Sequence, residues 1–155
     1  MEWKKGRGKL GVLQPLIGSW EANAESPMGP VHVLRTFVPV LGGKYVQMTV
    51  KWDYAQGGYE ELALIGIGDS VDGPPKGASA PLSIWSFTSD GKHSTGTLAD
   101  VTDIHPQAIG FESQMPAGLA RQAYWPDDEE GFRWVVEART KKGWNRFVEH
   151  LYKNV

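Results

Sequence analysis

Cysteine is absent from this 155-residue chain. Its absence excludes disulfide scaffolds, cysteine-ligated zinc, iron–sulfur clusters and thiol catalysis. The chain also lacks any apolar run near the ~20 residues that a membrane-spanning helix needs. The charged segment 1–5 has no apolar stretch of the kind found in a signal peptide. We therefore expect a soluble, cytoplasmic protein that does not associate with membranes.

Neither sign of charge is in marked excess. The chain has 16 Lys+Arg and 18 Asp+Glu, for a net charge of −2. Nucleic-acid-binding domains usually carry a clear basic surplus, so we expect no nucleic-acid partner. The length is that of one domain, and 41% hydrophobic residues exclude disorder as a global description. We expect a single domain over 1–155, with a loose segment at 1–9 and a flexible, proline-containing loop at 69–81.

Long helices have little room here, because 19 Gly and 10 Pro interrupt the chain. The 7 Trp, 5 Tyr and 5 Phe favour short strands joined by turns. Alternation predicts a short helical turn over 10–17 and then about ten strands, at 17–24, 31–38, 44–54, 59–69, 82–89, 93–101, 108–115, 119–125, 132–140 and 144–152. We predict an all-β fold, an antiparallel up-and-down β-barrel, because closure removes exposed edges. A two-sheet sandwich is the alternative.

The segment 13–20 carries a family resemblance. A helical turn that leads into Gly18-x-Trp20 resembles the opening of the calycin superfamily, which includes lipocalins and fatty-acid-binding proteins. Arg35, the turn at 41–45 and the Gly-x-Asp of 66–69 are similar to uncharacterised bacterial lipocalin-like families. The turn at 25–30 departs from the fatty-acid-binding pattern, since it is too short for a two-helix lid.

The resemblance implies a floored barrel that holds a ligand. In calycins the tryptophan of Gly-x-Trp lies across the closed end, and a basic residue of the last strand often packs on it. Gly18, Trp20 and Lys153 are the expected floor, with Lys153 as the basic residue because the first strand must pair with the last. The expected function is binding of a small hydrophobic or amphipathic ligand, with a mostly apolar wall. The candidate ligand-binding residues are Arg35, Met48, Trp52, Phe132, Trp134 and Glu149.

The last hairpin decides which side chains face inward. A two-residue turn at Lys142-Gly143 would place Glu149 on the same face as Phe132 and Trp134. A buried carboxylate needs a partner, and Arg35 or a ligand could provide one. A position for Glu149 at the solvated rim is equally compatible with the pattern.

Other functions remain open at this stage. His150-Leu151 resembles the haem-ligating pair of nitrobindin-type calycins, so haem bound by His150 is an alternative, although the same register faces His150 outward. The four histidines show no metal-binding spacing, and we expect no metal site. No catalytic constellation is recognisable, so we expect neither an enzyme nor a cofactor. A further alternative is an enzyme that uses the barrel mouth. Another is a filled barrel that acts as an interaction module or homodimer.

Overall fold

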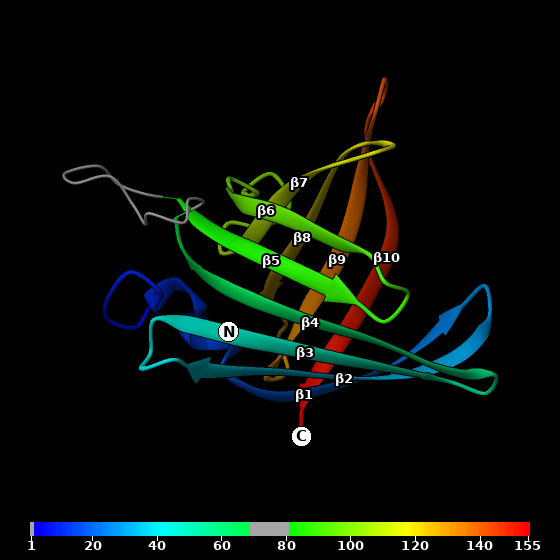
Figure 1. The fold of residues 1–155 in the computed structure, drawn as a ribbon, viewed down its shortest axis with the longest axis horizontal. Coiled ribbons are helices and arrows are strands. Elements are labelled where there is room, and N and C mark those ends of the chain that lie inside the picture. The colour runs from blue at the N-terminus through cyan, green and yellow to red at the C-terminus, as the bar shows by residue number, and fades with distance from the viewer. Residues whose placement is uncertain (1, 69–80) are drawn as a thin grey trace.

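The computed structural model describes residues 2–68 and 81–155, which form a closed barrel of antiparallel strands (Figure 1). The chain enters through a 3-10 helix, η1 (Gly11–Leu16). The strands are β1 (Gly18–Ser26), β2 (Gly29–Val40), β3 (Tyr45–Tyr54), β4 (Gly57–Ile67), β5 (Leu82–Thr88), β6 (His93–Ala99), β7 (Ile109–Met115), β8 (Gly118–Pro126), β9 (Gly131–Thr140) and β10 (Gly143–Asn154). Each strand pairs with its sequence neighbours, and β1 pairs with β10 to close the ring. The predicted up-and-down barrel is confirmed, and the sandwich is excluded. Among the described residues, no helix is long and apolar enough to cross a bilayer.

The two ends of the barrel differ. The turns β1–β2, β3–β4, β5–β6, β7–β8 and β9–β10 lie at one end, because consecutive antiparallel strands reverse direction. The other end holds the remaining connections, both chain termini and η1, which lies near the end of β2 and the start of β3 (Figure 1). We call the end with η1 the floor and the opposite end the mouth.

Trp20 joins η1 to the barrel wall. Its indole Nε1 donates a hydrogen bond of 2.8 Å to the carbonyl oxygen of Leu16. Its ring meets Phe132 edge-on at a centroid distance of 4.9 Å. Gly18, with a φ of 136°, adopts a backbone conformation that side chains disfavour, and this lets the chain turn from η1 into β1. Trp20 therefore lies at the floor of the barrel, between η1 and Phe132.

The N-terminal segment is more tethered than its composition indicates. The Trp3 backbone N–H donates a hydrogen bond of 2.6 Å to Gln107 Oε1. The Trp3 ring packs edge-on against the Phe132 ring, with their centroids 6.5 Å apart. The Gly6 N–H donates to the carbonyl of Gly11 at 2.8 Å. This segment has no regular secondary structure, but it covers the floor from outside. Most of the predicted loop at 69–81, residues 69–80, lies outside the described residues.

The pairing of the last hairpin differs from the sequence prediction in two ways. Gly143 pairs with Thr140, so the turn residues are Lys141 and Lys142 rather than Lys142 and Gly143. This moves the pairing by two residues, which leaves the two faces of the strand unchanged. A bulge between Arg146 and Val148 then shifts the register by one residue, and because strand side chains alternate between faces, it exchanges the inner and outer sets of β10 from Val148 onward.

Candidate functional site

A cavity of about 500 Å³ opens at the mouth of the barrel. Its walls come mainly from strands β3 to β10, and the aromatic side chains Trp52, Phe111 and Trp134 supply much of its apolar surface. Polar side chains also line it, namely Tyr59, Glu61, Ser86, Thr88, Ser94, Ser113 and Gln122, together with Arg121 and Arg139. A concave apolar surface with several polar groups is the usual composition of a small-molecule site.

Arg35 lies beneath this cavity, on the inner face of β2, and is fully buried. Its guanidinium carbon is 4.3 Å from the centre of the Trp134 ring and 5.2 Å from that of Tyr152. Its Nη1 group donates to the Tyr124 hydroxyl at 3.1 Å and contacts Met48 Sδ at 3.2 Å. The Nε and Nη2 groups make no hydrogen bond within the described chain. Arg35 is thus a buried cation held by aromatic rings.

No carboxylate among the described residues lies within ion-pair distance of Arg35. Burial opposes the charge of the guanidinium, but the polar neighbours Tyr152, Tyr124 and Glu61 outweigh it and raise its pKa. Burial also raises the pKa of Tyr124, so its hydroxyl keeps its proton. The interior therefore holds a permanent positive charge that is only partly compensated.

Gln122 connects the Arg35 layer to the cavity. Its Oε1 atom accepts hydrogen bonds from the Tyr124 hydroxyl at 2.9 Å and from Trp134 Nε1 at 3.1 Å. A chain of hydrogen bonds thus runs from Arg35 through Tyr124 to Gln122, which itself lines the cavity.

Glu61 is the inward-facing carboxylate of the cavity wall. It accepts a hydrogen bond of 2.5 Å from Ser86 Oγ on the neighbouring strand β5. Cross-strand register places Glu61 beside Val50, and Val50 beside Arg35. Glu61 and Arg35 therefore occupy one row of the barrel interior, with opposite charges separated by an apolar residue.

His150 faces into the barrel, contrary to the sequence prediction. It pairs with Trp134 across the β9–β10 hairpin, and its ring lies 5.0 Å from that of Trp52 and 5.3 Å from that of Trp134. Its Nδ1 atom is buried without a hydrogen-bond partner among the described residues. Burial, followed by the charge of Arg35, lowers the pKa of His150 to about 4. The imidazole is consequently neutral near pH 7.

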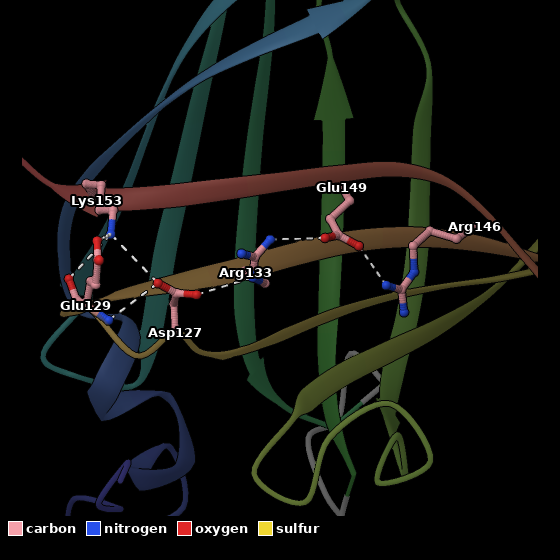
Figure 2. A network of polar contacts seen from close by, with 6 residues as sticks. All are labelled: Asp127, Glu129, Arg133, Arg146, Glu149 and Lys153. Carbon is pink, nitrogen blue, oxygen red and sulfur yellow. Dashed lines mark hydrogen bonds and ion pairs between the residues drawn. The ribbon is translucent and has the colours of Figure 1, made fainter. Parts of the chain in front are cut away.

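Glu149 lies on the outer surface, which corrects its expected role as an inward polar anchor. Its carboxylate accepts hydrogen bonds from Arg146 Nη1 at 2.6 Å and from Arg133 Nη1 at 3.1 Å (Figure 2). Arg35 donates a hydrogen bond to Tyr124 instead, so the expected Arg35–Glu149 pair does not form. The physical reason is the bulge between Arg146 and Val148, which shifts the register of β10 by one residue.

Arg35 and Tyr124 are in direct contact through their 3.1 Å hydrogen bond inside the barrel. Arg35 and Glu149 therefore lie on opposite sides of the barrel wall.

Lys153 also lies outside, which corrects its expected place on the floor. It pairs with Gly131 across the hairpin, and its Nζ is 3.1 Å from Glu129 Oε2 and 3.7 Å from Asp127 Oδ2 (Figure 2). No described cation stacks on the Trp20 ring, which packs against Phe132 instead.

The remaining candidate residues separate into three layers. Trp52 and Trp134 line the cavity. Met48 lies beneath it in contact with Arg35. Phe132 belongs to the floor, where it packs on Trp20 and stacks on Tyr152 at 5.0 Å.

Sequence reasoning missed Glu61, Ser86, Tyr124 and Gln122. Alternation showed that only one residue of the pair Glu60-Glu61 could face inward, but it could not say which one. Gln122 alternates with Tyr124 on β8, and this shared face was the available signal. Their relation to Arg35 depends on contacts across the barrel, which strand patterns do not contain.

Within residues 2–68 and 81–155, no group of three or more His, Asp or Glu side chains could hold a metal ion. No protein-family model matches the chain, and no curated protein sequence is significantly similar to it.

Proposed function

We propose that this protein is a calycin-like carrier that binds a small amphipathic ligand in the cavity at the barrel mouth. One observation carries the proposal: a cavity of about 500 Å³ with aromatic walls lies above the buried, incompletely compensated charge of Arg35. Burial of apolar ligand surface against the aromatic walls would supply most of the affinity. The polar groups around the cavity would orient the bound molecule.

The test uses Nile red, a neutral dye whose emission changes in an apolar environment. Ser94 lines the cavity and Thr95 is exposed on the opposite face of the same strand, so the two positions form a matched pair. We expect Ser94→Trp to fill part of the cavity and weaken dye binding roughly tenfold or more. Thr95→Trp adds the same side chain outside and should bind as the unaltered protein does.

Circular dichroism melting curves serve to check that both variants are folded. Equal dye affinity for the two variants would overturn the proposal, because the dye would then bind elsewhere. Native mass spectrometry of the purified protein adds a second readout, in which a small-molecule adduct is expected on Thr95→Trp and not on Ser94→Trp.

Haem binding through His150 has less support. The inward position of the imidazole suits an axial ligand, but the ring is enclosed by Trp52 and Trp134 and does not line the cavity. A porphyrin needs a flat slot directly beside its ligating nitrogen, and two indole rings occupy the space next to His150. The residues present therefore do not fit haem.

A further inference from the structure

The geometry points to Gln122 as the residue that recognises the ligand, by donating a hydrogen bond to a carbonyl oxygen on a neutral, largely apolar molecule. This inference rests on the proposed binding function and specifies its ligand class. It follows from the direction of each hydrogen bond around Gln122, from the atom that these bonds leave unused, and from the balance of charge below the cavity.

The hydrogen-bond network fixes the orientation of the Gln122 amide. Arg35 can only donate, so the Tyr124 hydroxyl accepts its hydrogen bond and directs its own proton to Gln122. The indole N–H of Trp134 can also only donate. Two donors converge on one atom of the amide, so that atom must be the oxygen, and the alternative flipped amide would place N–H against N–H and O–H.

This orientation leaves the amide nitrogen of Gln122 available. Nε2 carries two N–H donors, and neither has a partner within the described chain. Nε2 does not belong to the buried polar atoms that lack a hydrogen-bond partner, so it is accessible, and the Gln122 side chain lines the cavity. A molecule in the cavity therefore meets a donor whose direction is already set by Tyr124 and Trp134, so little side-chain freedom is lost on binding.

The charges favour a neutral ligand. Below and beside the cavity, Arg35 contributes one positive charge and Glu61 one negative charge in the same interior row. Of the two arginines at the rim, Arg121 already contacts Asp103 and Glu137, and Arg139 stacks on Trp144. An anionic ligand would be repelled by Glu61 and a cationic one by Arg35, whereas a carbonyl group satisfies Gln122 without adding charge.

The experiment compares three ligands of similar shape: acetylnaphthalene, ethylnaphthalene and naphthoate, substituted at the same ring position. They present a ketone, a hydrocarbon and a carboxylate to the same site. We expect calorimetry to show that the protein binds the ketone roughly tenfold more tightly than the hydrocarbon, as one hydrogen bond in a buried site provides. Binding of the carboxylate should be weaker than that of the ketone.

Two variants test the role of Gln122 directly. Gln122→Glu keeps an oxygen for Tyr124 and Trp134 but replaces the donor by an acceptor, and Gln122→Met removes both functions. Both should lose the preference for the ketone over the hydrocarbon. Nitrogen–proton correlation NMR gives an independent readout. The side-chain amide signal of Gln122 is identified as the signal that disappears in Gln122→Glu. In the unaltered protein, this signal should shift when acetylnaphthalene is added and stay in place when ethylnaphthalene is added.

The outcomes separate this inference from the proposed function. If no ligand binds and Ser94→Trp has no effect on Nile red, both fail. A second outcome is that all three ligands bind, that Ser94→Trp weakens their binding, and that the Gln122 variants keep the same order of affinities. In that case only the assignment of Gln122 fails. A preference for naphthoate in the unaltered protein would overturn the neutral ligand class.

Discussion

His150 carries the most perturbed histidine environment of the described chain. Its ring is packed against Trp52, Trp134 and Tyr152, at centroid distances of 5.0, 5.3 and 6.0 Å. Burial and the nearby Arg35 both disfavour the protonated form, and they lower its pKa to about 4. The environment that prevents protonation in the folded state is lost on unfolding, so His150 links stability to pH.

We predict that acidification destabilises the fold through His150. The unfolded chain takes up a proton near the ordinary pKa of 6.5, whereas the folded protein takes it up only near pH 4. The contribution of neutral His150 to the free energy of unfolding is fully present above pH 6.5. It decreases as the pH falls to about 4, by up to about 1.4 kcal/mol per pH unit. Urea denaturation across this range should show a shallower pH dependence for His150→Gln. His93→Gln, on the exposed face of β6, is the control, and an equal slope for both variants would contradict the prediction.

At the scale of elements, the outer face of β9 and β10 carries a row of alternating charges. Figure 2 shows Glu149 between Arg133 and Arg146, and Asp127 between Arg133 and Lys153. Glu137 extends the row, with one carboxylate oxygen on Arg121 and the other on Arg146, each at 2.9 Å. The side chain of Glu137 is 6% exposed and that of Glu149 is 37% exposed, so the two carboxylates differ mainly in burial.

We predict unequal effects for the same substitution at these two positions. Glu137→Gln leaves the buried guanidinium of Arg121 without its buried partner and should lower the free energy of unfolding by about 3 kcal/mol. Glu149→Gln removes two partly exposed ion pairs, those with Arg133 and Arg146, and should cost less than about 1 kcal/mol for each pair. Denaturant unfolding at low and high salt measures both. Equal losses would show that burial does not control the strength of these contacts.

At the scale of the whole molecule, the β1–β10 junction is the shortest seam of the barrel. Its register consists of Trp20 with Asn154 and Glu21 with Lys153, and the Val155 N–H adds a hydrogen bond to the Ser19 carbonyl. The rest of β1 pairs only with β2, and the rest of β10 only with β9. The tip of the β1–β2 hairpin and the start of β10 accordingly lie far apart in Figure 1.

We predict that this seam opens before the rest of the barrel. In β10, the amides of residues 145–151 that point toward β9 are hydrogen-bonded, whereas the alternate amides point toward the open seam. Native-state hydrogen exchange measured by NMR should therefore show fast and slow amides in alternation along this segment. Uniform protection would mean that β1 and β10 pair along their full length in solution.

The sequence by itself determined the number of strands and their order, whereas the pairing of β1 with β10 decided between a closed barrel and a sandwich. Alternation of apolar and polar side chains is a local property, and breakers such as Gly42-Gly43 and Asp90-Gly91 mark the turns. Because most strands are followed by a short connection, antiparallel pairing between sequence neighbours follows directly. The same local signals indicated that Arg35 shares a face with apolar residues, and it is buried.

Only the tertiary structure decided which residues of β10 face inward and which groups meet inside the barrel. The one-residue bulge after Arg146 reverses the faces of the rest of β10, and this bulge has no distinctive sequence signature. This is why Glu149 and His150 exchange places relative to the sequence prediction. The network of Arg35, Tyr124 and Gln122 joins strands distant in the chain, so it forms only when closure brings β2 opposite β8.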